Sequence, residues 1–191
     1  MSSVPLDATA VSVPTGQRAL LERATVREVL MGAQDNLTNI LAVVLGVTIG
    51  AGRAELVALA GTAAAVAESI SMGGVLYTST RAELDLDARN AATGDAPPLH
   101  ASRLGPAGAA LVTGLAALAG GLLPLAPFLF LPLIPAVIVS LAVSVLALFG
   151  LGSAIANVTR RTWWRDGIRL VLIAGTAALA AALIGAVLRV G

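Results

Sequence analysis

The chain has 191 residues, of which 57% are hydrophobic and only 12% are charged, whereas soluble domains are nearer a quarter charged. Most of it therefore belongs in a lipid bilayer, and a net charge of +1 gives no case for nucleic-acid binding. The sequence has no cysteine, no lysine and one histidine, His100, which excludes disulfides, thiolate sites, lysine-bearing phosphate loops and a multi-histidine metal centre within one chain.

The N-terminal segment divides into two parts. Residues 1–17 are polar and contain prolines, and they lack the basic start, apolar core and cleavage site of a signal peptide, so we expect a disordered tail. From Arg18 to Leu30 apolar and charged residues are interleaved. This pattern predicts an amphipathic helix that lies on the membrane surface before the first span.

Five segments are long and apolar enough to cross a bilayer, which takes about 20 residues. The fold class we predict is an all-α membrane protein. Four prolines, from Pro124 to Pro135, mark the turn into the fourth span. The only substantial polar loop is expected at 79–105. The predicted spans are about 29–50, 56–78, 106–123, 128–158 and 168–190, which together form one transmembrane domain over 18–191.

The arginines give the orientation. Ten of the twelve lie in the N-terminal segment, in the loop 79–105, and around the fourth predicted loop, from Arg160 to Arg169. Only Arg53 and Arg189 fall on the opposite side. Because cytoplasmic loops carry the excess of basic residues, we expect the N-terminus in the cytosol and the C-terminus on the opposite side.

The first predicted span has polar residues in its first half. Met31, Asp35, Thr38 and Asn39 share one face of a helix, because residues three and four apart are neighbours there. A carboxylate at the bilayer centre costs roughly 3 kcal/mol, so Asp35 is a candidate cation ligand or proton carrier. The alternative is an interfacial aspartate that is satisfied by Arg27 or by backbone groups.

The second predicted span contains a glutamate among small apolar residues. Glu68, Met72 and Leu76 lie on one helical face, with Ser71 beside it. A carboxylate one turn from a thioether combines a hard and a softer ligand, which suits transition metals better than Ca²⁺ or Mg²⁺. The alternative for Met72 is ordinary core packing.

An acidic run follows this span. Glu83, Asp85 and Asp87 could attract cations to the cytosolic mouth of a path, or they could form a solvated loop. His100 has no partner nearby in the sequence and is expected at the surface.

Four motifs in the same order resemble the vacuolar iron transporter family. The first span, REVLMGAQDNLTNILAVVLGV, is similar to the family's GANDG followed by an apolar run. SISMGGVLYTST resembles its SMAAGEYLS, and GGLLPLAPFL resembles its GALLPLLPY turn. The segment from ALFGLGSAIANV to the closing ALIGAVL resembles its last two spans. The resemblance runs from about Arg27 to the C-terminus.

The resemblance implies a five-span homodimer with a cytosolic N-terminus. It also implies movement of Fe²⁺, and often Mn²⁺, out of the cytosol in exchange for protons. An aspartate of the first span and a methionine of the second line the family's path between the subunits, and these positions correspond to Asp35 and Met72.

Two departures from the family pattern stand out. Leu76 takes the place of the glutamate in SMAAGEY, and Glu68, two turns away on the same face, is our candidate to replace it. The loop 79–105 is too short for the glutamate-rich domain with which many members collect iron.

We therefore expect a multi-pass exporter of Fe²⁺ or Mn²⁺, with proton antiport, in a bacterial-type plasma membrane. We expect that it is not an enzyme and that it binds no resident cofactor. Asp35, Met72 and Glu68 would bind the metal, supported by Met31, Thr38, Asn39 and Ser71. Two alternatives are a non-transporting member that acts as an interaction or regulatory partner, and a transporter of a small organic solute, against which the 3% of aromatic residues counts.

Overall fold

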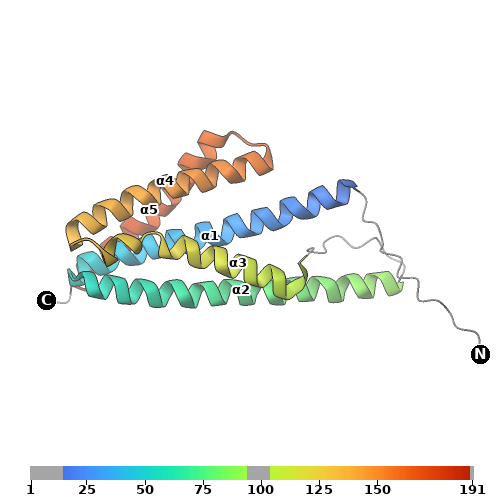
Figure 1. The fold of residues 1–191 in the computed structure, drawn as a ribbon, viewed down its shortest axis with the longest axis horizontal. Coiled ribbons are helices and arrows are strands. Elements are labelled where there is room, and N and C mark those ends of the chain that lie inside the picture. Colours follow the sequence, from blue (N-terminus) through green and yellow to red (C-terminus); the bar gives the residue numbers. More distant parts are fainter. Residues whose placement is uncertain (1–14, 94–103, 190–191) are drawn as a thin grey trace, which may run out of the picture.

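The computed structural model describes residues 15–93 and 104–189. Over these residues the chain is helical and contains no strand, and each of its five long helices has the length and composition to cross a membrane. This confirms the all-α, five-span fold (Figure 1). In chain order the elements are α1 (Thr15–Ala51), α2 (Ala54–Thr93), α3 (Gly105–Leu122), the 3-10 turn η1 (Ala126–Leu129), α4 (Leu133–Thr159) and α5 (Trp163–Val187).

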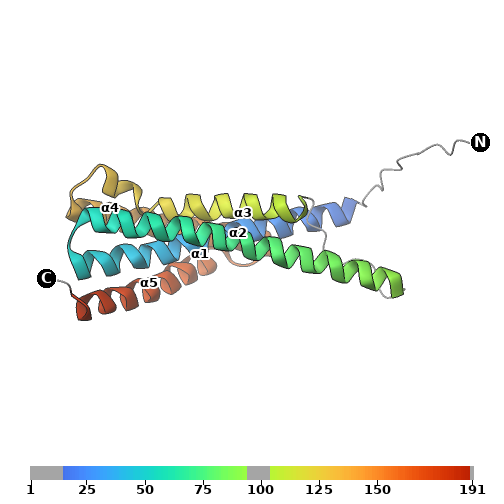
Figure 2. The same ribbon diagram turned by 90° about the horizontal axis from the view of Figure 1, so that it is seen from below.

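Helix α1 lies at the centre of the bundle. It contacts all four other long helices, while α2 pairs with α3 and α4 pairs with α5. Figures 1 and 2 show α1 between these two pairs, with successive helices alternating in direction. Because the number of spans is odd, the start of α1 and the end of α5 lie at opposite ends of the bundle.

Two buried clusters hold α1 in place. One joins Ile40 and Val44 of α1 to α2, the η1 turn and α4, and the other joins Leu37 and Leu41 to α4 and α5. On the outside, large apolar side chains such as Leu146 are exposed, as expected where lipid replaces water. Apolar side chains gain little free energy when they move from lipid to a helix–helix contact. Close packing between small residues must therefore supply much of the free energy of helix association.

Glycines bring the helix backbones together at several crossings. A Cβ on Gly120 would overlap the backbone of Ala33, which places α3 directly against α1. A Cβ on Gly185 would likewise overlap the carbonyl oxygen of Gly46, where α5 crosses α1. These are the small-residue interfaces that membrane helices use.

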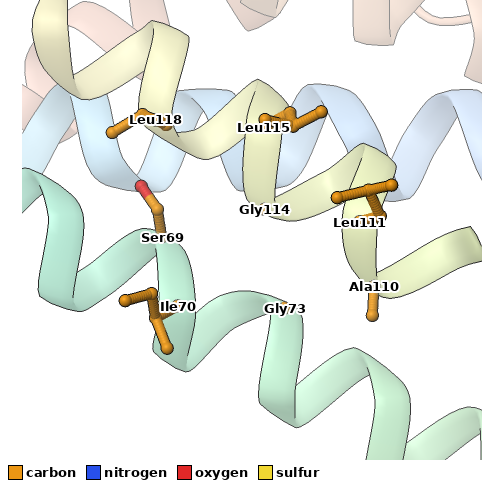
Figure 3. Close-up of a pocket in the computed structure, with 8 residues that line it drawn as sticks. All are labelled: Ser69, Ile70, Gly73, Ala110, Leu111, Gly114, Leu115 and Leu118. Atoms are coloured by element: carbon orange, nitrogen blue, oxygen red, sulfur yellow. The ribbon is translucent and has the colours of Figure 1, made fainter. Parts of the chain in front are cut away.

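Small residues also join α2 to α3. A Cβ on Gly73 would lie 3.1 Å from the carbonyl oxygen of Ala110, and one on Gly114 would lie 3.2 Å from that of Ser69. A groove of about 390 Å³ runs along this contact. Figure 3 shows the residues that line it. Its walls are almost wholly apolar, and they carry no group suited to binding a cation.

The fourth span follows the proline-rich turn and begins later than predicted. The expected span 128–158 is wrong at its start, because Phe128 belongs to η1 and α4 begins at Leu133. The prolines do mark the turn, as predicted. The buried hydroxyl of Ser140 donates a hydrogen bond of 2.7 Å to the carbonyl oxygen of Pro124, which fastens the turn to α4.

Two other predictions need correction at the arginine-rich end of the bundle. Helix α2 continues to Thr93, so the first part of the predicted polar loop 79–105 is helical. The predicted surface helix from Arg18 is continuous with the first span within α1, which begins at Thr15. The remainder of the predicted tail, residues 1–14, and His100 lie outside the described residues.

Candidate metal path between α1, α2 and α3

An open cavity of about 420 Å³ lies between the arginine-rich halves of α1 and α2, with Thr113 of α3 at its back. It combines two thioethers, two carboxylates and an amide with apolar side chains. Gly32 lets α1 pack closely against α3 at the back of the cavity, since a Cβ there would lie 2.8 Å from the Thr113 methyl group. The lining residues are Glu28, Met31, Gly32, Gln34, Asp35, Met72, Val75, Leu76 and Thr113.

The two principal ligands predicted from the sequence meet in this cavity. Asp35 comes from α1 and Met72 from α2, and Met31 lies one turn before Asp35. Both Met31 and Asp35 are exposed on the open side. Asp35 forms no hydrogen bond or ion pair with any residue whose side chain the structure describes. Its carboxylate is therefore available to a ligand.

Glu68, the third predicted ligand, does not line the cavity; it lies one turn from Met72, next to Asn39 of α1. The Asn39 side-chain amide donates a hydrogen bond to Glu68 Oε1, which joins the two helices at this level. Asp35 and Glu68 are carboxylates on neighbouring helices. A cation bound between two carboxylates offsets their mutual repulsion.

The other predicted site residues lie elsewhere. Thr38 is half-buried on α1 and Ser71 is exposed on α2, and neither lines the cavity. Glu83, Asp85 and Asp87 lie on the extension of α2, and Glu83 is about 10 Å along the helix from Leu76 at 1.5 Å per residue. Asp85 pairs with Arg81 at 3.6 Å.

Within the described residues of one chain, no three acidic or histidine side chains gather closely enough to hold a metal ion. Asp35, Glu68 and Met72 supply two carboxylates and one thioether. One copy alone therefore offers an incomplete set of ligands, on a surface that is open to a neighbour.

The comparison with protein families gave a match over most of the chain. Residues 26–96 and 88–186 match the model of the VIT family. The chain belongs to the VIT family. The comparison with curated proteins gave no match. Membership confirms the resemblance to vacuolar iron transporters and indicates a multi-pass membrane protein of a metal-ion transporter family, which is not a family of enzymes.

The sequence interpretation missed Asn36 as a structural residue of this VIT family member. Asn36 is 0% exposed. Its Nδ2 lies 2.8 Å from the carbonyl oxygen of Ala117 on α3. The same nitrogen lies 3.0 Å from the Ser69 hydroxyl and 3.2 Å from the Ala65 carbonyl oxygen, both on α2. Gly121 leaves room for the amide, since a Cβ there would lie 2.8 Å from it.

Asn36 fixes the rotation of α1 about its own axis. Adjacent residues on a helix differ by about 100° in direction. With Asn36 pointing into the contact with α2 and α3, Asp35 is turned to the open cavity. The sequence does show a side-chain amide, Asn36, within an apolar span. Only the fold shows which residues of α2 and α3 this amide contacts.

We expect Asn36→Ala to lower the stability of the bundle by about 2 kcal/mol, because bonds to two helices are lost and a cavity remains. Asn39→Ala is the matched control, since Asn39 is exposed and makes one side-chain hydrogen bond. Thermal melting in detergent would compare the two. Equal melting temperatures for both variants would contradict the role of Asn36.

Glu28 and Gln34 were also missed as cavity residues. Glu28, Met31 and Asp35 have the spacing i, i+3 and i+7, so helical periodicity could have found Glu28. It was assigned instead to a separate surface helix. Because α1 is continuous, Glu28 adds a second carboxylate to this cavity.

Proposed function

We propose that the chain exports a divalent transition metal, Fe²⁺ or Mn²⁺, from the cytosol by proton antiport. It would act as a homodimer in a bacterial-type plasma membrane, with a cytosolic N-terminus. The observation that carries the proposal is the meeting of Asp35 and Met72, from two different helices, in one open cavity.

The ligand types support a transition metal. Carboxylate oxygens bind most divalent cations, but a thioether favours softer ions than Mg²⁺ and Ca²⁺. Asp35 and Glu68 would supply the charge and Met72 the sulfur. Asn39, which bonds to Glu68, would hold that carboxylate in place.

A second copy would complete the site. If the open side of α1 faces its symmetry mate, the cavity closes and each ligand is present twice. A two-fold axis is the commonest symmetry of homo-oligomers, and it brings the same patch of each copy together. The exposed Met31 and Asp35 are the side chains that such contact would cover.

Proton coupling follows from the same carboxylates. A protonated acid is a poor metal ligand, so binding of protons from outside would release the metal there. Loss of those protons to the cytosol would make the carboxylates ready for the next ion. Metal would leave and protons would enter in each cycle.

The test is metal uptake by proteoliposomes that contain the purified chain. Fe²⁺, Mn²⁺, Co²⁺ and Mg²⁺ would be compared with protein-free vesicles. We expect uptake of Fe²⁺ or Mn²⁺ in preference to Mg²⁺. Preference for Mg²⁺ would contradict the assignment of Met72, and absence of uptake with folded protein would contradict transport itself.

Replacement of the thioether should alter metal choice rather than abolish uptake. Met72→Leu keeps the volume but removes the sulfur, so we expect uptake of Fe²⁺ and Mn²⁺ to fall about tenfold, which equals ~1.4 kcal/mol. Uptake of Mg²⁺ should not fall. Val66→Ala, on an exposed part of α2, is the control. An equal fall for all metals would assign Met72 to packing instead.

One observation favours a second function. Leu76 lines the cavity where the family resemblance places a glutamate, so a carboxylate is missing from this wall. A member that has lost transport could still serve as a membrane interaction or regulatory partner. A folded dimer with no flux for any metal would support this interaction or regulatory function.

A further inference from the structure

A second cavity, of about 210 Å³, lies between α1, α4 and α5 at the arginine-rich end of the bundle. It is distinct from the candidate metal cavity, with which it shares only Gln34 among the lining residues. Its walls combine two guanidinium groups, one carboxylate and one amide with aliphatic side chains. The lining residues are Gln34, Gly152, Ile155, Arg161, Asp166, Arg169, Leu170 and Ile173.

The turn between α4 and α5 builds this cavity. The two helices cross closely, since a Cβ on Gly152 would lie 2.7 Å from the carbonyl oxygen of Asp166. Arg160 adopts the left-handed conformation, with φ of 55°, and so ends α4. The backbone N–H of Arg161 then donates a hydrogen bond of 2.8 Å to Ala156. Arg161 of this turn and Arg169 of α5 line the same cavity.

The two guanidinium groups in the cavity have no anionic partner among the residues that the structure describes. Neither Arg161 nor Arg169 forms an ion pair with any carboxylate of the described residues, although Asp166 lines the same cavity. Arg165 differs, because its guanidinium lies over the Trp164 ring, 5.2 Å from the centroid. The cavity thus carries two positive charges against one negative charge.

The surroundings place this cavity at the membrane–water boundary. Trp163 and Trp164 are 54% and 45% exposed at the start of α5, and exposed tryptophans typically lie at the level of lipid head groups. Ile173, at the apolar end of the cavity, is 50% exposed and is followed on α5 by further exposed apolar residues. The cavity therefore has a charged end and an apolar end that opens toward lipid.

We propose that this cavity binds the phosphodiester group of a membrane phospholipid, with Arg161 and Arg169 on the phosphate and the acyl chains beside Ile173. Basic pockets between transmembrane helices suit lipid head groups. Asp166 limits the excess charge to one, so a singly charged phosphodiester fits better than a doubly charged phosphate. The bound lipid would join α5 to α1 through Gln34, the residue before Asp35.

The test measures lipid binding and not transport, so it does not depend on the metal path. The full chain in detergent would be titrated with phosphatidylglycerol. Thermal melting and native mass spectrometry would report stabilisation and retained lipid. We expect a rise in melting temperature of several degrees and at least one lipid bound per chain. A separate titration with inorganic phosphate should give neither effect.

Matched variants separate the cavity from general surface charge. R161Q/R169Q should abolish most of the lipid-induced rise, while R160Q/R165Q, which removes the same charge from the same turn, should retain it. Arg169→Gln alone is the substitute if the first double variant melts lower than wild type without lipid. Equal losses in both double variants, no rise with lipid, or a rise with inorganic phosphate alone would overturn the proposal.

Discussion

Asp35→Asn is expected to reduce uptake of Fe²⁺ and Mn²⁺ into proteoliposomes by more than about tenfold, the equivalent of ~1.4 kcal/mol. The substitution keeps the shape of the side chain and removes its charge. Asp35 lines the cavity and has no partner among the described side chains, so the substitution would remove a proposed anionic ligand without breaking a contact between described residues. In a dimer the loss occurs twice around one site.

The control for this variant is Glu55→Gln. Glu55 is exposed at the other end of the bundle, where it pairs with Arg53 at 3.8 Å, and its removal changes net charge by the same amount. We expect uptake near the wild-type level. Retained uptake in Asp35→Asn, with both variants folded, would remove Asp35 from the path.

Gly120→Ala is expected to have the largest effect on folding. The added Cβ would overlap the backbone of Ala33, so α3 and α1 must move apart. Overpacking of this kind costs roughly 1–3 kcal/mol, and backbone cannot give way as a flexible side chain can. The melting temperature in detergent should fall by several degrees, and the yield of folded protein should fall with it.

Gly175→Ala provides the matched control. Gly175 lies within α5 and is exposed, and a Cβ there would meet nothing within 4 Å. Since alanine favours a helix over glycine by up to about 1 kcal/mol, this variant should be as stable as wild type or more so. A lower melting temperature for Gly175→Ala than for Gly120→Ala would contradict the packing described for α1 and α3.

Hydropathy was sufficient to predict the five spans, because each must present about 20 apolar residues to lipid. Hydropathy did not predict the polar part of a helix that continues past its apolar span. The extension of α2 to Thr93 is polar, so it carries no hydropathy signal and was predicted as a loop. The fourth span was predicted to begin too early, because η1 is as apolar as the helix that follows it.

The candidate site was predictable in part. Asp35 stood out as a carboxylate in an apolar span and Met72 as a thioether one turn from Glu68, and the family resemblance pointed to both positions. The structure brings both to one cavity. Asn36 was missed because its hydrogen-bond partners lie between 29 and 81 positions away along the chain. No local pattern shows that Ala117 of α3 would meet it, since that contact depends on how three helices pack.

Proton-coupled export of a transition metal is tested most directly by a single recording of two signals. Proteoliposomes would carry a metal-sensitive dye and a pH-sensitive dye in their lumen, and Mn²⁺ would be added outside. We predict that Mn²⁺ enters while protons leave, so that the lumen becomes more alkaline, and that both signals are lost together in Asp35→Asn. Entry of Mn²⁺ with no change in lumenal pH would contradict antiport, and no entry by folded wild-type protein would contradict transport.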